Sequence, residues 1–268
     1  MLKILFVTQS DPFYIPEFFR EFIAHWDPLQ IDVRGVIIQS PLGKKSRREL
    51  VRQMLAFYGP GNFFRLGVTY AVKKALAFVV VGATRGRFPG TFSLEHLLLK
   101  SGWPIIRNGN INAPEFTSRL KEMNLDLIVS VAASQKFKAE VLAVPRFGFI
   151  NVHNSRLPKN RGMLPNFWAL CNIDQEPVSG MTVHKMNATL DDGPIVLQHD
   201  VLLSPRESLH DLILRTKRLN AHLVLEALAL YRGGEPIYLP NDAGQATYNN
   251  FPTREDVRVF KAKGLRLL

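Results

Sequence analysis

Apolar and polar positions change period repeatedly along the first forty residues. Residues 3–8 form a short apolar, β-branched run that ends in a polar turn, and residues 15–26 place their apolar side chains at helical spacing. A second continuous apolar run follows at residues 31–39. The pattern predicts a strand, a helix and a second buried strand.

Further short apolar runs lie at residues 104–106, 126–133 and 147–152, with helical stretches between them. Strands that alternate with helices are typical of a parallel sheet covered on both faces. We therefore predict an α/β fold with a Rossmann-like, open, mostly parallel twisted sheet, flanked by helices and followed by a short C-terminal extension.

Residues 44–92 interrupt this alternation and are too long for a simple crossover. The segment begins with a basic cluster and continues with aromatic and apolar material at helical spacing; the cluster is Lys44, Lys45, Arg47 and Arg48. We interpret the segment as an insertion. Its cations favour a solvated helix face, and a phosphate-binding or membrane-contacting patch is the alternative.

The last third of the chain predicts two helices. Residues 208–231 carry leucine, isoleucine and valine at helical spacing and end in Arg232-Gly233-Gly234, which suits a helix C-terminus; a second helical pattern covers residues 254–263. We expect a catalytic domain at 1–205, and a C-terminal helix with a short extension at 206–268. The apolar helix can either cover the sheet or form a homodimer.

Composition limits the classes of protein to consider. With 268 residues, 46% of them apolar and 21% charged, the chain can bury a sizeable core. Its single cysteine, Cys171, excludes an intramolecular disulfide framework. The first apolar run is too short for an export signal. The sequence has no run of eighteen apolar residues, so we predict no transmembrane helix. These features predict a cytoplasmic protein.

A formal net charge of +11 predicts attraction to polyanions. Nucleic acid, an anionic membrane and a phosphorylated substrate all fit this charge, and charge alone does not choose among them.

Candidate chemistry is densest where a predicted strand ends in Asn151-Val152-His153, with Asp191-Asp192 forty residues later. Residues 151 and 153 of a strand face the same side, and ligands of open α/β sheets bind at the carboxyl ends of strands. An amide that donates to an oxyanion, an imidazole that moves a proton and a carboxylate that orients the imidazole suit acyl transfer to an amine. An Asn-x-His pair is as often a structural hydrogen-bond network.

The segment FGFINVHNSRLPKNRG, followed by SGMTVHKMNATLDDGPIVLQ, resembles the folate-dependent formyltransferases. Members of that family carry Asn-Ile-His, Ser-Leu-Leu-Pro, Arg-Gly and Leu-Asp-x-Gly in this order. The resemblance covers roughly residues 100–215 and includes the opening strand.

The resemblance implies that Asn151, His153 and Asp191 are the catalytic residues and that 10-formyltetrahydrofolate is the formyl donor, with no metal. Asp191 aligns with the family aspartate because it follows Leu190 directly. In the implied mechanism a neutral amine attacks the formyl carbon, Asn151 and protonated His153 stabilise the oxyanion, and Asp191 holds the imidazole and helps to relay a proton through water.

The resemblance also implies two binding regions beside these residues. Backbone groups of two segments would bind the pterin, and the candidates are Gln135, Lys136, Phe137, Asn187, Leu190 and Asp191. Ser155, Leu157, Pro158 and Arg161 match the family loop, whereas Asn154 and Arg156 depart from it. The substrate-binding candidates are Ser155, Lys159, Arg161, Asn166 and Trp168; solvated loop cations and a core tryptophan are the alternatives for Lys159, Arg161 and Trp168.

The acceptor that the resemblance favours is an amino sugar on a nucleotide carrier. Methionyl-tRNA formyltransferases add a C-terminal β-barrel, for which the roughly sixty residues after Pro205 are too few, so nucleic acid is disfavoured. Glycinamide ribonucleotide formyltransferases carry a His-x-Gln segment where this chain has residues 164–168. Both activities stay open as alternatives, as does a non-catalytic module that binds folate or an anion.

Four other histidines are predicted to be core or hydrogen-bonded residues: His184, His199, His210 and His222. Neither they nor Cys171 have the spacing of a metal site.

Overall fold

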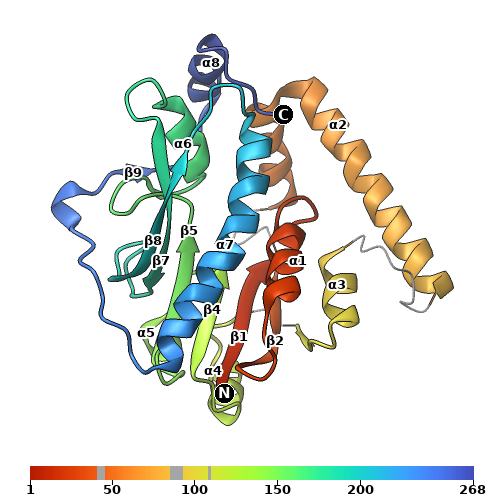
Figure 1. Ribbon diagram of the computed structural model, residues 1–268. Coiled ribbons are helices and arrows are strands. Elements are labelled where there is room, and N and C mark those ends of the chain that lie inside the picture. Colours follow the sequence, from red (N-terminus) through yellow and green to blue (C-terminus); the bar gives the residue numbers. More distant parts are fainter. Residues whose placement is uncertain (41–45, 85–92, 108–109) are drawn as a thin grey trace.

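A computed structural model describes residues 1–40, 46–84, 93–107 and 110–268. Within these ranges a seven-stranded sheet forms the centre of the molecule (Figure 1). Its strands, in spatial order, are β3 (Ile105–Ile106), β2 (Ile31–Gln39), β1 (Leu2–Gln9), β4 (Leu127–Val131), β5 (Phe149–His153), β7 (Val178–Lys185) and β8 (Ile195–Leu202).

The first five strands of this order are parallel, and β7 and β8 are antiparallel to their neighbours. The predicted α/β fold with a mostly parallel sheet is therefore confirmed. Every strand predicted from an apolar run is present, with ends that differ by at most two residues. The β7–β8 hairpin was not predicted as a pair.

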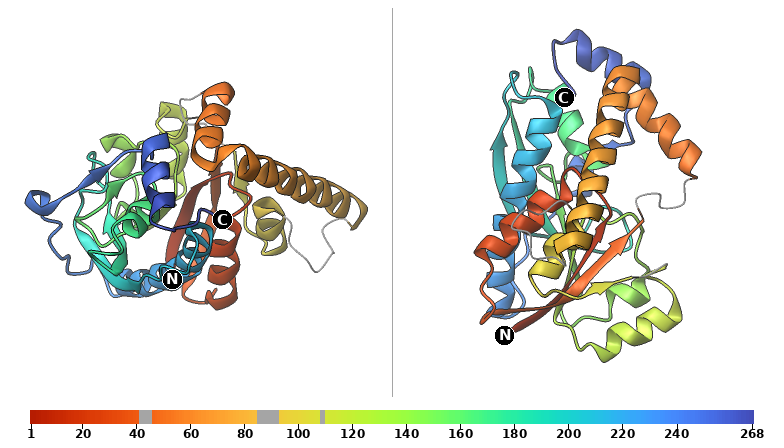
Figure 2. Two further views of the ribbon diagram at one scale, coloured as in Figure 1. Left: turned by 90° about the horizontal axis from the view of Figure 1, so that it is seen from above. Right: turned by 90° about the vertical axis from the view of Figure 1, so that its right-hand side faces the viewer.

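Helices cover both faces of the sheet (Figure 2). On one face α1 (Ile15–His25) lies beside α7 (Leu209–Arg232) and α3 (Leu94–Lys100), and their apolar residues share one core with β1 and β4. On the other face α4 (Pro114–Glu122) and α5 (Ala139–Leu142) form a smaller core with alternate residues of β1. Helix α7 thus covers the sheet, which is one of the two roles predicted for it.

The residues 44–92 contain a long helix, α2 (Arg47–Thr84), that bends at Gly59 and Pro60. Gly59 has φ 76°, a left-handed conformation that glycine adopts without steric cost. Before the bend, Phe57 is buried against the core. After it, the helix extends away from the body (Figure 2, left). The predicted cations Lys44 and Lys45 and residues 85–92 lie outside the described residues, whereas Arg47 and Arg48 are exposed.

The C-terminal extension packs against the loop that follows β5. A two-stranded sheet pairs β6 (Arg161–Gly162) with β9 (Tyr248–Asn249), and a single 3-10 turn covers Ala243–Gln245. Two helices, α6 (Pro165–Cys171) and α8 (Arg254–Ala262), stack through Phe167 and Phe260. Among the described helices, none combines the length and apolar character needed to cross a membrane.

Candidate active site

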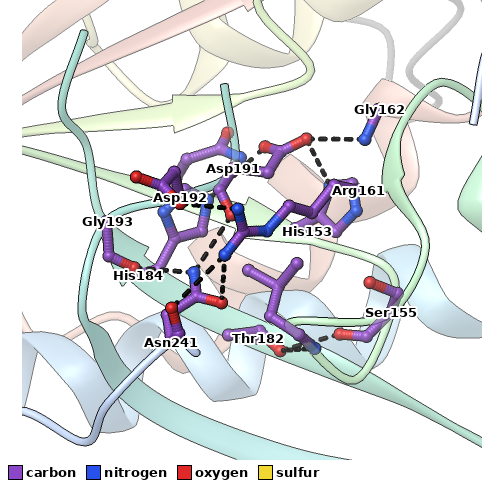
Figure 3. A network of polar contacts seen from close by, with 12 residues as sticks. His153, Ser155, Arg161, Gly162, Thr182, His184, Asp191, Asp192, Gly193 and Asn241 are labelled. Atoms are coloured by element: carbon purple, nitrogen blue, oxygen red, sulfur yellow. Dashed lines mark hydrogen bonds and ion pairs between the residues drawn. The ribbon is translucent and has the colours of Figure 1, made fainter. Parts of the chain in front are cut away.

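Strands β5 and β7 bring polar side chains to one face of the sheet, and Figure 3 shows three of them, His153, Thr182 and His184. In the antiparallel register Asn151 lies opposite His184, and His153 lies opposite Thr182. Directly opposed residues of an antiparallel pair project to the same side. The Asn151–His153 face predicted from the sequence is therefore completed by a histidine from the neighbouring strand.

The carboxylate of Asp191 lies between the two histidines. Its Oδ2 is 3.7 Å from Nδ1 of His153, and its Oδ1 is 3.6 Å from Nε2 of His184. The backbone N–H of Gly162 donates to Oδ2 at 2.9 Å. Asp191 is only 6% exposed and has φ 53°, so the connection between β7 and β8 turns this side chain inward at a left-handed residue.

Close packing of the backbone fixes this connection. A Cβ atom at Gly193 would lie 1.8 Å from the carbonyl oxygen of Lys185, so only glycine fits. The amide of Asn241, from the C-terminal extension, donates to the carbonyl oxygens of Asp191 and Gly193 at 3.0 and 2.9 Å. The extension therefore helps to hold the aspartate in place.

Arg161 is buried beneath the same turn. Its guanidinium is 2.5 Å from the carboxylate of Asp192 and donates to Oδ1 of Asn241 at 2.8 Å. Asp191 and Asp192 therefore have different surroundings: the first contacts the histidines and the second binds Arg161. The sequence-based choice of Asp191 agrees with this geometry, whereas the predicted substrate-binding Arg161 is occupied by internal partners.

The titration of the two central groups follows from their surroundings. Burial raises the pKa of Asp191, but the hydrogen bond from His184, the charge of His153 and the N–H of Gly162 outweigh it and lower the pKa to about 2. Burial lowers the pKa of His153 below its usual value, against the charge of Asp191, which raises it. Asp191 is thus ionised and His153 is held towards its neutral form.

Carbonyl oxygens identify the tautomer of each histidine, because they only accept hydrogen bonds. Nε2 of His153 donates to the carbonyl of Asn160 at 2.9 Å, which leaves Nδ1 facing Asp191. Nδ1 of His184 donates to the carbonyl of Lys185 at 3.1 Å, and its Nε2 lies 3.2 Å from the Asn151 amide nitrogen and 3.6 Å from Oδ1 of Asp191. The same amide nitrogen carries a second N–H that a substrate oxygen can use.

The remaining substrate-binding candidates have protein partners. Ser155 is fully buried and donates to the carbonyl of Lys159, and Asn166 donates to Thr216 at 2.9 Å. Lys159 forms an exposed ion pair with Glu176. Trp168 is half-buried, and its Nε1 donates to backbone carbonyls of Met163 and Asn250.

The pterin-binding candidates come from two places. Gln135 accepts from the backbone of Ile111, the carbonyl of Lys136 accepts from Asn112, and Phe137 is buried. On the β7–β8 connection, Asn187 accepts from the backbone N–H of Thr189, and Leu190 is 36% exposed next to Asp191. An apolar side chain beside ionised and amide groups fits a flat, partly polar heterocycle.

Sequence reasoning missed two residues near the site. His184 was predicted to be buried or hydrogen-bonded, which it is, but its contact with Asp191 was not foreseen. Lys217 of α7 is 7% exposed, and its positive charge acts on both His153 and Asp11. Among the described residues, no carboxylate lies within ion-pair distance of its ammonium. Burial lowers the pKa of Lys217 to about 8.

The other predicted non-catalytic histidines have protein partners. His210 contacts the hydroxyl of Tyr14 at 3.0 Å, and His199 lies 3.2 Å from Glu226. His222 binds Glu21 at 2.9 Å, beside His25, and the three side chains could hold a metal ion, an arrangement that sequence spacing did not indicate.

Comparison with known proteins identifies a family model and several relatives that match this chain. The model of the formyl transferase family matches residues 81–228. A methionyl-tRNA formyltransferase from Thermotoga neapolitana is 31% identical over 216 residues, which is 78% of this chain and 68% of the relative. Alignments to other methionyl-tRNA formyltransferases span about half of those relatives.

Solved structures share the fold at low sequence identity. A sugar N-formyltransferase from Shewanella sp FDAARGOS_354 aligns with a TM-score of 0.56 at 17% identity and covers 98% of this chain and 88% of that one. A phosphoribosylglycinamide formyltransferase from Bacillus halodurans aligns with a TM-score of 0.57 at 17% identity and covers 88% and 98%.

Proposed function

The chain belongs to the formyl transferase family, whose enzymes use 10-formyltetrahydrofolate, and we propose that it formylates a phosphorylated primary amine, with a nucleotide-linked amino sugar as the leading acceptor. In this proposal Asn151, His153 and Asp191 carry the chemistry. The domain division at residue 205 and a homodimer belong to the same proposal.

One observation carries the catalytic assignment: a single ionised carboxylate lies 3.7 Å from His153 on the face that also holds Asn151. The site thus combines a hydrogen-bond donor for a developing oxyanion, an imidazole and the negative charge that stabilises the imidazole when it is protonated.

Each side chain has one task in the proposed reaction. The donor supplies an activated formyl group. The free N–H of Asn151 donates to the oxygen that becomes negative, and the neutral His153 accepts the proton that the attacking amine loses. The 3.7 Å contact is longer than a hydrogen bond, and protonation of Nδ1 turns it into a charge-assisted hydrogen bond to Asp191. The imidazolium formed in this way also stabilises the oxyanion. It then gives its proton to the nitrogen of tetrahydrofolate, which leaves as its bond to the formyl carbon breaks and the N-formyl product forms.

The buried ammonium of Lys217 supports an anionic acceptor. A buried cation without a close counter-ion is costly, and a phosphate oxygen of the acceptor would supply a partner for this ammonium, whose charge acts on His153. Glycinamide ribonucleotide, a nucleotide-linked amino sugar and a charged tRNA all carry phosphate. The resemblance of the Pro-Asn-Phe-Trp-Ala stretch at residues 165–169 to sugar N-formyltransferases leads us to place the amino sugar first.

A second candidate acceptor is methionyl-tRNA. The 31% identity to the Thermotoga neapolitana protein over 216 residues favours it, and the net charge of +11 suits a polyanion. A non-catalytic module that binds folate is the remaining alternative.

Formyl transfer from 10-formyltetrahydrofolate to a panel of nucleotide-linked amino sugars, glycinamide ribonucleotide and methionyl-tRNA tests the proposal. We expect turnover of a nucleotide sugar that is lost in Asn151→Ala, His153→Ala and Asp191→Asn but retained in His199→Ala, an exposed histidine on β8. Turnover of methionyl-tRNA alone would select the second candidate. Folate binding without turnover of any of the three would contradict the enzymatic assignment.

A further inference from the structure

The part of α2 beyond its bend extends away from the body of the protein (Figure 2) and carries exposed apolar side chains. Phe64, Val68, Val72, Leu76 and Val79 recur at intervals of four, four, four and three residues. This spacing places them along one side of a helix, and all five are exposed, Phe64 by 73% and Val79 by 61%. We call these five residues the outer stripe.

The opposite side of the same helix is attached to the body. Phe63, Leu66, Thr69 and Lys73 are half-buried and follow one another at intervals of three to four residues. The ammonium of Lys73 lies 3.4 Å from the carbonyl oxygen of Pro12 and 5.2 Å from the centre of the Phe13 ring. The helix is therefore held to the body along this side, which carries both apolar and polar residues, and the outer stripe is left outward.

An outward apolar side is the reverse of the usual arrangement, in which a surface helix turns its apolar side to the core. Single exposed apolar residues are common, but a continuous stripe indicates a binding surface. Phe78, which is 83% exposed, adds to the edge of the stripe.

The charges beside the stripe are all positive. Arg65 directly follows Phe64 of the stripe, Lys74 precedes Phe78 by about one helical turn, and the sequence has no aspartate or glutamate from residue 50 to residue 94. A second copy of the chain on this surface would bring these cations together with no carboxylate of the segment to pair with them. A surface of anionic lipid offers both an apolar interior for the stripe and phosphates for the cations.

We propose that the outer stripe binds the surface of an anionic lipid bilayer, with the helix axis lying along that surface and its aromatic and aliphatic side chains below the headgroups. This surface lies apart from the candidate active site and does not depend on the acceptor that the enzyme uses.

Flotation with vesicles tests the proposal. We expect the full chain to float with vesicles that contain phosphatidylglycerol and phosphatidylcholine, and to bind those of phosphatidylcholine alone at least tenfold more weakly. The variant Phe64→Ser/Val68→Ser/Val72→Ser should lose at least tenfold in vesicle affinity. A matched control, Leu29→Ser/Leu202→Ser/Ile237→Ser, removes three exposed apolar side chains elsewhere and should bind as the unmodified protein does.

Two further measurements distinguish a lipid surface from a second copy of the chain as the binding partner of the outer stripe. Arg65→Gln/Lys74→Gln should weaken binding to the anionic vesicles and leave the far-ultraviolet circular dichroism unchanged. Equal binding by the stripe variant and the unmodified protein, or no binding by either, would overturn the proposal. A dimer in light scattering that the stripe variant converts to a monomer, without vesicle binding by the unmodified protein, would assign the stripe to a second copy.

Discussion

Oδ1 of Asp191 lies 3.6 Å from Nε2 of His184, so the carboxylate that faces His153 is also held from the adjacent strand. His184 binds the Asn151 amide as well. It therefore contacts two of the three proposed catalytic residues without being one of them, and we assign it a positioning role.

Replacing His184 with leucine should lower kcat/KM by roughly 10-fold, the factor that corresponds to one lost hydrogen bond of about 1.4 kcal/mol. Because the charge of His184 helps to lower the pKa of His153, the proposed base, its removal should also move the acidic limb of the pH–rate profile to higher pH. A pH series of initial rates measures both effects. His199→Leu is the control, and an unshifted acidic limb would contradict the positioning role.

Ionised Asp191 should stabilise the fold in a defined pH range. Its pKa is lowered from 3.8 to about 2 in the folded protein, so its contribution is complete above pH 4 and is lost as the pH falls towards 2. The difference in the free energy of unfolding between the unmodified protein and Asp191→Asn should shrink by about 2 kcal/mol over this range. Urea titrations at pH 5, 4, 3 and 2 measure it, and a constant difference would show that the carboxylate pKa is not lowered.

Lys217 should have the opposite pH dependence. Its pKa is lowered from 10.5 to about 8, so the charged form destabilises the folded state below pH 8, and this cost disappears as the pH rises towards 10.5. At pH 7 the variant Lys217→Met should be more stable than the unmodified protein, by about 3 kcal/mol at most. Urea titrations at pH 7 and pH 9.5 measure the change, with the exposed Lys261→Met as control.

The same Lys217→Met variant should bind the acceptor less tightly. If the ammonium contacts an acceptor phosphate, KM for the acceptor should rise about tenfold or more while KM for 10-formyltetrahydrofolate stays the same. Initial rates with each substrate varied in turn separate the two constants. Equal rises in both would identify a general disturbance of the site instead.

Two glycine substitutions should have opposite effects on stability. In Gly193→Ala the new Cβ would lie 1.8 Å from the carbonyl oxygen of Lys185, so the turn that carries Asp191 must move. We expect a loss of activity and a loss of about 2 kcal/mol or more in stability. Gly61→Ala meets no atom within 4 Å in the helical part of α2 and should stabilise by about 0.5 to 1 kcal/mol. Thermal unfolding of both variants checks the contrast.

Local sequence pattern predicted much of the sheet, because buried parallel strands such as β1 and β2 are short continuous apolar runs between helices. The antiparallel β7–β8 pair was harder to predict because β8 turns exposed polar residues, including His199 and Asp200, to solvent. The bend of α2 at Gly59 was not predicted, because it lies within a segment whose residue pattern is helical on both sides.

Asn151 and His153 were predicted to be catalytic because they share one strand and one face and match the family motif. His184 could have been included only with knowledge of the strand register, which pairs residues 33 positions apart. Arg161 was predicted to bind substrate because it is a loop cation. Its burial and its ion pair with Asp192 depend on a turn that lies about thirty residues further along the chain. Such long-range pairs leave no local periodic pattern in the sequence.

The register between β5 and β7 also limits how this protein can change during evolution. Alternate residues of a strand face opposite sides, so inserting or deleting one residue in the paired part of β7 would turn His184 to the far side of the sheet and bring a neighbour into its place. A one-residue insertion in that strand keeps the site only where a β-bulge absorbs it, and the pairing of β7 with β8 already shifts register between Val183 and His184. The connection that carries Asp191 is limited in another way. Gly193 lies so close to the carbonyl oxygen of Lys185 that no side chain fits there, so any descendant that keeps this turn must keep the glycine.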